Sequence, residues 1–153
     1  MAGEDTIRIE QVDHLGIRVS DPDKAMAFYK VLGFELFHRV THDAVIIIKN
    51  PQGVEINLIV NANDTHDDRN ILMDDKDTKY PGFTHVALRV DSIEATMKAL
   101  AKNGIEIRQG PVQFGESDNV SLFVRDPDLN VLELRGRSDD PATLPGLKSY
   151  TPD

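Results

Sequence analysis

Two histidines in this sequence stand in the same local context, 71 residues apart. His14 opens the phrase His-Leu-Gly-Ile-Arg-Val, and His85 opens the phrase His-Val-Ala-Leu-Arg-Val. A single strand histidine is more often a core or surface residue than a ligand, but imidazole is a common metal ligand and the repetition favours a shared site. His38, His42 and His66 have no such counterpart, and we interpret them as surface or loop residues.

Acidic and amide side chains interrupt two of the apolar strands expected from the sequence. Glu133 stands between two leucines, and Glu55 and Asn57 stand in the apolar run 54–60. Side chains alternate along a strand, so Glu55 and Asn57 share a face. Two imidazoles with one or two carboxylates suit a divalent ion and leave positions open for substrate. The sequence has no cysteine, which excludes thiolate ligands and a cysteine nucleophile.

The elements that must position these residues are repeated as well. Residues 12–19 alternate like a strand, and Asp21-Pro22 predicts the start of a helix that ends at Gly33. In the second copy, Asp91 and Glu94 resemble a capping box for a helix that ends before Gly104. The expected strands are 34–40, 44–49 and 53–60 in the first copy, and 105–109, 118–125 and 130–136 in the second.

Each copy is therefore expected to form a strand, a helix and three strands, which predicts an α+β fold made of two βαβββ modules. We expect one domain over residues 8–137, built from repeats at about 8–61 and 82–137. Residues 62–81 form an acidic connector, and 138–153 form a tail that packs loosely or across a partner. If the two copies pack as a pseudo-symmetric pair, His14, His85 and Glu133 would meet.

The charge balance excludes several partners. The 153 residues hold 17 Lys and Arg against 26 Asp and Glu, a net charge of −9. Such a chain is a poor candidate for binding nucleic acid or an anionic membrane. No apolar run approaches the roughly 20 residues that span a bilayer, and no signal peptide is evident, so we expect a cytoplasmic protein. A local cluster of Arg18, Arg89 and Arg135 can still receive an anionic substrate.

These phrases resemble the vicinal oxygen chelate superfamily. The resemblance rests on His14-Leu-Gly-Ile-Arg-Val, Ala27-Phe-Tyr-Lys-Val-Leu-Gly-Phe, His85-Val-Ala-Leu-Arg-Val and Asp126-Pro-Asp-Leu-Asn-Val-Leu-Glu-Leu, and covers about residues 10–136. The family includes glyoxalase I, extradiol dioxygenases, fosfomycin-resistance transferases, methylmalonyl-CoA epimerase and bleomycin-resistance proteins. The resemblance implies a half-open β-barrel around a divalent ion (Ni, Zn, Fe, Mn or Co), and a homodimer. His14, His85 and Glu133 fall on its ligand positions.

The fourth ligand position is where this sequence departs from glyoxalase I, which has a glutamate there. Ungapped alignment of the two copies places Asn57 opposite Glu133, and Glu55 takes that place only if the strand shifts by two residues. The fourth ligand is then Glu55, Asn57 or a water molecule. Arg18 and Asn61 match positions that contact the glutathione carboxylates in glyoxalase I, and Arg89 is a further candidate for substrate binding.

Three functions are compatible with this set of residues. The first is a glyoxalase I-like lyase or isomerase, in which the ion chelates vicinal oxygens of a small substrate, such as a glutathione adduct, and Glu133 or Glu55 transfers a proton. The second is an extradiol-type dioxygenase or thiol transferase that uses only His14, His85 and Glu133. The third is a metal-free binding or resistance protein, against which the complete set of His, His and Glu argues.

Overall fold

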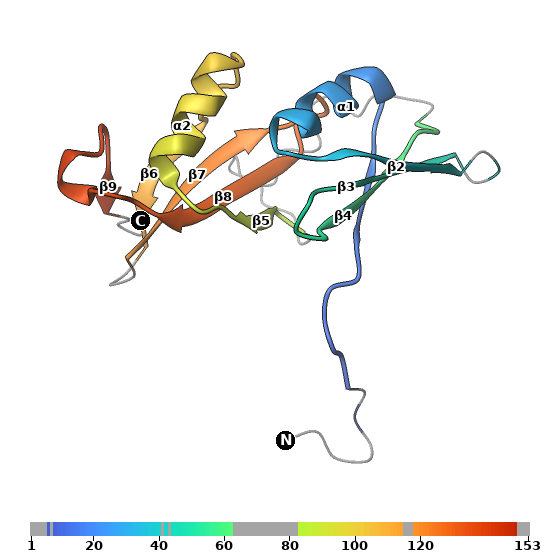
Figure 1. Cartoon of the computed structure of the whole chain (residues 1–153), viewed down its shortest axis with the longest axis horizontal. Coiled ribbons are helices and arrows are strands. Elements are labelled where there is room, and N and C mark those ends of the chain that lie inside the picture. The colour runs from blue at the N-terminus through green and yellow to red at the C-terminus, as the bar shows by residue number, and fades with distance from the viewer. Residues whose placement is uncertain are drawn as a thin grey trace, which may run out of the picture. The chain divides into compact units, whose positions relative to one another are not determined.

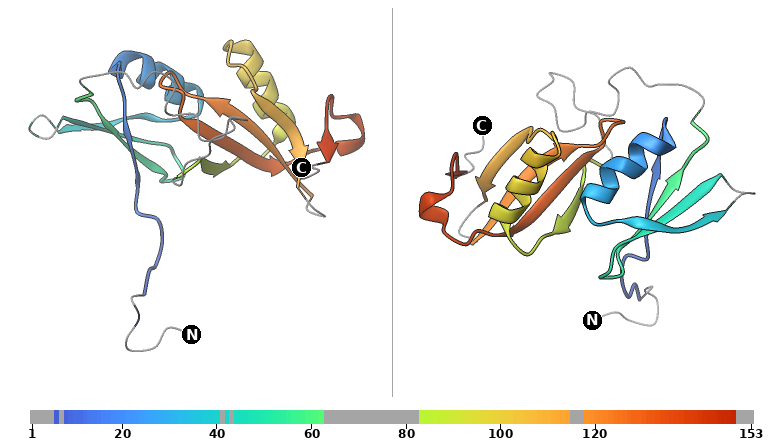
Figure 2. Two further views of the ribbon diagram at one scale, coloured as in Figure 1. Left: turned by 180° about the vertical axis from the view of Figure 1, so that it is seen from behind. Right: turned by 45° about the horizontal axis from the view of Figure 1, so that its top comes forward.

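The chain forms two compact units, Met1–Asn63 and Asp64–Asp153, each with an α-helix on one face of its own sheet (Figures 1 and 2). The computed structural model describes residues 6, 8–40, 42, 44–62, 83–114 and 118–149. The boundary falls within the predicted connector, whose residues from 63 to 81, His66 included, lie outside the described residues. We therefore describe each unit by itself.

The first unit is a βαβββ module, as predicted. Its sheet has the order β1-β4-β3-β2, with β1 parallel to β4 and the other neighbours antiparallel. The sequence expectations for its strands hold within a few residues at each end. Its elements are β1 (Leu15–Arg18), α1 (Pro22–Val31), β2 (Glu35–Val40), β3 (Val45–Lys49) and β4 (Glu55–Ile59).

Helix α1 begins and ends where the sequence predicts. The Asp21 carboxylate accepts a hydrogen bond from the backbone N–H of Lys24 at 3.1 Å, which satisfies one of the free donors of the first turn. Gly33 ends the helix with φ of +91°, a conformation that costs glycine little. The buried face of α1, with Ala25, Phe28 and Tyr29, belongs to a core that also holds Ile17, Val19, Phe34, Ile46, Ile48, Ile56 and Leu58.

The second unit repeats the module and extends it by one strand. Its sheet has the order β5-β8-β7-β6-β9, with β5 parallel to β8. Its core holds Ile93, Leu100, Val120, Leu122, Val124, Leu132 and Leu134. Its elements are β5 (Val86–Arg89), α2 (Ile93–Lys102), β6 (Gln109–Gln113), β7 (Asn119–Arg125), β8 (Val131–Arg137), a 3₁₀ helix (Pro141–Thr143) and β9 (Lys148–Ser149).

Two local predictions in the second unit are wrong. The strand expected at 105–109 forms at Gln109–Gln113, where an irregular register between Gln109 and Val112 accommodates Pro111 in the sheet. The N-cap of α2 is Ser92, whose Oγ accepts from the backbone N–H of Ala95 at 3.2 Å, and Asp91 and Glu94 form no capping box.

The segment after β8 contacts its own unit, whereas the sequence predicts a tail that packs loosely or across a partner. Strand β9 pairs in parallel with β6, with Lys148 opposite Val112 and Ser149 opposite Gln113. Glu94 of α2 accepts hydrogen bonds from the hydroxyl of Ser138 and from the backbone N–H of Asp139. Among the described residues, no helix has the length and the apolar content needed to cross a membrane.

Candidate metal centre

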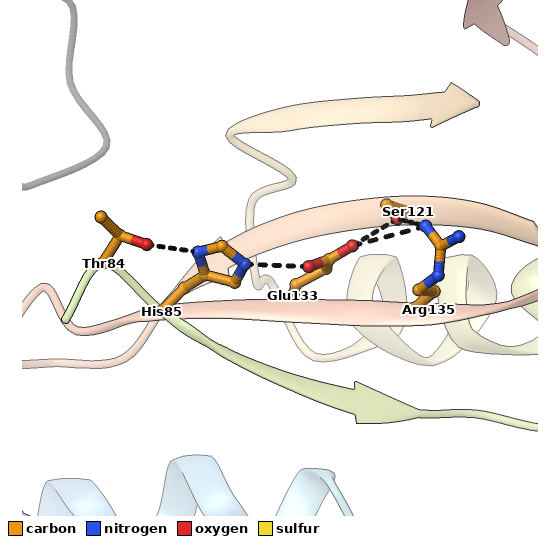
Figure 3. Close-up of polar contacts among 5 residues, drawn as sticks. All are labelled: Thr84, His85, Ser121, Glu133 and Arg135. Atoms are coloured by element: carbon orange, nitrogen blue, oxygen red, sulfur yellow. Dashed lines mark hydrogen bonds and ion pairs between the residues drawn. The ribbon is translucent and has the colours of Figure 1, made fainter. Parts of the chain in front are cut away.

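His85 and Glu133 are in direct contact in the second unit. His85 lies just before β5, and Glu133 lies in β8, paired in register with Ala87. Because His85 is two residues before Ala87, its side chain shares the face of the sheet on which Glu133 lies. Nε2 of His85 is 3.0 Å from Oε2 of Glu133 (Figure 3). The start of β5 and the neighbouring strand β8 thus bring an imidazole nitrogen and a carboxylate oxygen together.

Glu133 is a buried carboxylate with partners on both oxygens. Its side chain is only 10% exposed, so an ionised form needs hydrogen bonds and countercharge. Oε2 faces His85, while Oε1 accepts from the Ser121 hydroxyl at 2.6 Å and lies 3.7 Å from the Arg135 guanidinium. Ser121 and Arg135 therefore hold Oε1 of the carboxylate, and Oε2 contacts the imidazole of His85.

The ring of His85 is oriented by its second nitrogen and by packing. Nδ1 lies 2.8 Å from the hydroxyl of Thr84, and a hydroxyl can donate or accept, so this contact persists whichever nitrogen carries the proton. The ring packs edge to face against Phe123, with centroids 5.6 Å apart. Phe123 belongs to an apolar cluster with Val112, Phe114 and Val131. These contacts direct Nε2 towards Glu133.

In the first unit, His14 lies beside two carboxylates. Its Nδ1 is 2.7 Å from the carboxylate of Asp13 and 3.9 Å from that of Glu55. One candidate ligand atom from each of these three residues lies within 4.8 Å of the others. A carboxylate only accepts hydrogen bonds, so the short contact with Asp13 keeps a proton on Nδ1. In the neutral ring, Nε2 then carries the lone pair that a metal ion needs.

Asn57 has the same sheet position in the first unit as Glu133 in the second. Asn57 pairs with Gly16, two residues after His14, just as Glu133 pairs with Ala87, two residues after His85. No two-residue shift brings Glu55 to this place. Among the described residues, the buried Oδ1 of Asn57 has no hydrogen-bond partner, which typically costs about 1–3 kcal/mol. Such an acceptor is suited to a cation or to a donor from a ligand.

Glu55 lies on the same face as Asn57 and is held from one side. Its Oε1 forms an ion pair with Nζ of Lys49 at 3.3 Å, and its side chain is 21% exposed. The ammonium of Lys49 in turn lies 4.0 Å from the ring centroid of Phe37. Glu55 is therefore a positioned carboxylate, with Oε2 on the side of His14.

The predicted substrate-binding residues lie on the same faces as these side chains. In the first unit, two of the predicted substrate-binding residues are joined, because Nε of Arg18 donates to Oδ1 of Asn61 at 3.1 Å. In the second unit, Arg89 pairs in register with Arg135, two positions beyond the Ala87–Glu133 pair. Each unit thus carries arginine on the face that holds its histidine.

Sequence reasoning missed the residues that hold the histidines and Glu133. Asp13 and Thr84 each directly precede a histidine and contact its Nδ1. Ser121 is fully buried and donates to Glu133 from the neighbouring strand, and its only sequence signal is a polar residue in the apolar run of β7. His38 and His42 are exposed, as the sequence predicts.

Comparisons with known proteins agree with this architecture. A family model described as the Glyoxalase/Bleomycin resistance protein/Dioxygenase superfamily matches residues 11–134. A probable lactoylglutathione lyase of Vibrio parahaemolyticus is 31% identical over 143 residues, which cover 87% of this chain and 95% of the relative.

Solved structures share the fold across almost their whole length. An integron cassette protein from the mobile metagenome of V. cholerae is 25% identical, with a TM-score of 0.61, covering 86% of this chain and 98% of that one. A glyoxalase/dioxygenase from Nostoc punctiforme is 18% identical, with a TM-score of 0.68, covering 88% and 99%. The predicted fold class is confirmed.

Proposed function

Because the chain belongs to the glyoxalase/bleomycin resistance protein/dioxygenase superfamily, we propose that it is a divalent-metal-dependent enzyme of the glyoxalase I type. Its substrate is a small molecule with two neighbouring oxygens, such as the hemithioacetal of glutathione and a 2-oxoaldehyde. The contact between His85 and Glu133 carries this proposal. The name of the Vibrio parahaemolyticus relative supports the choice of substrate class.

We propose His85 and Glu133 as ligands in the second unit, and His14 and Asn57 as the candidate ligands at the equivalent positions of the first. Imidazole nitrogen together with carboxylate and amide oxygen suits Ni, Zn, Fe, Mn or Co. The chain has no cysteine that could add a thiolate ligand. The fit is supported by Oδ1 of Asn57, which has no hydrogen-bond partner in the described part of the chain. It is also supported by the pairing of His14 Nδ1 with Asp13, which leaves Nε2 for an ion.

The protein's own residues supply proton transfer and orientation. A bound ion would stabilise negative charge on the two substrate oxygens. Glu55 is the better candidate for moving the proton, because Oε1 of Glu133 is occupied by Ser121 and Oε2 lies beside His85. Lys49 holds one oxygen of Glu55 and leaves the other for the substrate. Arg89 and the Arg18–Asn61 pair are suited to carboxylates of a glutathione moiety.

An add-back assay tests this function. The metal-stripped protein is supplied in turn with Ni, Zn, Fe, Mn and Co, and is assayed on a hemithioacetal and on a panel of catechols. We expect metal-dependent turnover of the hemithioacetal. A protein that binds no divalent ion and turns over neither substrate class would instead fit a metal-free binding or resistance protein.

One observation favours a second function. With Asn57 in place of a carboxylate, His14, His85 and Glu133 are a set of two histidines and one carboxylate, the ligand type of non-haem iron oxygenases. An extradiol-type dioxygenase with this set would consume oxygen with a catechol and Fe²⁺. Oxygen uptake in the same panel distinguishes it from the hemithioacetal activity.

A further inference from the structure

Ser121 and Arg135 form a chain of hydrogen bonds that ends on Glu133 (Figure 3). Ser121 in β7 pairs in register with Arg135 in β8, two residues beyond Glu133. Nη1 of Arg135 lies 3.0 Å from Oγ of Ser121, and Oγ lies 2.6 Å from Oε1 of Glu133. Ser121 is completely buried, whereas the side chain of Arg135 is 30% exposed. The chain therefore runs from the partly exposed guanidinium to a buried oxygen of Glu133.

The chemistry of the donors fixes the direction of this chain. A guanidinium has only donors, so Oγ of Ser121 accepts from Arg135. Its single proton is then available for Oε1 of Glu133. Hydrogen bonds to an ionised acceptor are shorter and stronger than those between neutral groups, and linked bonds polarise one another. The contact of 2.6 Å fits such a bond.

The two oxygens of Glu133 consequently differ. Oε1 is engaged by Ser121 and lies 3.7 Å from Arg135, whereas Oε2 lies beside Nε2 of His85. A carboxylate can bind an ion through one oxygen or through both. We propose that Ser121 and Arg135 are positioning residues that make Glu133 a one-oxygen ligand, presenting Oε2 and withholding Oε1. This inference rests on the proposed function, in which Glu133 is a metal ligand.

A one-oxygen ligand has a consequence for the reaction. An ion held by fewer protein atoms keeps coordination positions open, and these are the positions that substrate oxygens occupy in a catalytic site. Partners that orient a ligand are commonly worth about 10- to 100-fold in metal affinity or activity. A serine that only filled space in the sheet would have no such effect on the ion.

Cobalt binding by the full-length protein tests the inference, with affinity from calorimetry and coordination from the visible spectrum. We expect Ser121→Ala to weaken Co²⁺ binding by about 10- to 100-fold. We also expect weaker d–d absorption, because a freed Oε1 raises the coordination number. Ser121→Thr retains the hydroxyl and should restore both properties. Arg135→Met should act like Ser121→Ala. Because the side chain of Arg135 is partly exposed, this variant keeps the test available if Ser121→Ala does not fold.

Val120→Ala is the matched control. Val120 is the preceding residue of the same strand, is fully buried, and faces the opposite side of the sheet from Ser121. The Val120→Ala substitution should lower the melting temperature without changing the cobalt affinity or the visible spectrum. If Ser121→Ala and Arg135→Met both bind Co²⁺ with the affinity and the spectrum of the wild type, the inference is overturned and the proposed function still stands. If the wild type binds no Co²⁺, the proposed function falls, and the inference with it.

Discussion

Asn57 and Glu133 occupy the same position in the two sheets, so an amide stands in one repeat where a carboxylate stands in the other. Each is paired across a parallel ladder with the residue two positions after a histidine. The environments differ, because Glu133 has Ser121 on Oε1 whereas the buried Oδ1 of Asn57 has no partner among the described residues. The repeat is symmetric in backbone and asymmetric in charge.

Replacing Asn57 by Asp restores the charge symmetry between the repeats. If Oδ1 of Asn57 is a ligand, Asn57→Asp should tighten Co²⁺ binding, because an ionised oxygen attracts a cation more strongly than an amide oxygen does. Calorimetric titration measures the change. Asn61→Asp is the control for added charge alone, since Oδ1 of Asn61 already accepts from Arg18. Equal affinity for Asn57→Asp and wild type would remove Asn57 from the ligand set.

Replacing Glu55 by Gln tests its role in proton transfer. General acid–base catalysis typically contributes about 10²- to 10⁴-fold, so kcat on the hemithioacetal should fall by that order. Cobalt affinity should stay unchanged, since Glu55 is not among the proposed ligands. Glu106→Gln, at a side chain 72% exposed, serves as the control. A Glu55→Gln enzyme with full activity would leave Glu133 as the proton carrier.

The contact between Glu94 and the segment after β8 should make stability depend on pH. Hydrogen bonds from the Ser138 hydroxyl and the Asp139 backbone lower the pKa of Glu94 from 4.5 to about 2. A lowered pKa in the folded state means that this stabilisation is present above pH 4.5 and is lost as the pH falls towards 2. The melting temperature of Glu94→Gln should therefore lie below that of the wild type at pH 6, with a gap that narrows towards pH 2. A gap independent of pH would contradict this role.

The repeat made much of the fold predictable. The matching phrases around His14 and His85 predicted strands at equivalent places in the two repeats. Asp21-Pro22 and Gly33 predicted the two ends of α1. The register of the parallel strand pairs also agrees with the ungapped alignment of Asn57 with Glu133. These features follow from local patterns, which the sequence displays directly.

Features that depend on tertiary contacts were not predictable. Ser92 rather than Asp91 caps α2, and Glu94 binds the segment after β8, which lies more than forty residues away. The strand around Pro111 forms because an irregular register places the proline in the sheet, which a simple alternation pattern cannot anticipate. Ser121 acquires its contact with Glu133 only once β7 and β8 pair.

The metal content of the purified protein tests the central claim most directly. Wild type, His85→Ala and Glu133→Gln are dialysed against a divalent ion, freed of excess, and analysed for metal per chain, with Val120→Ala as the control. We predict one ion per chain in the wild type and in the control. His85→Ala and Glu133→Gln should lose more than about 100-fold in metal affinity, because losing a ligand costs more than losing a residue that orients a ligand. A wild type without stoichiometric metal, or undiminished binding by His85→Ala, would contradict the account.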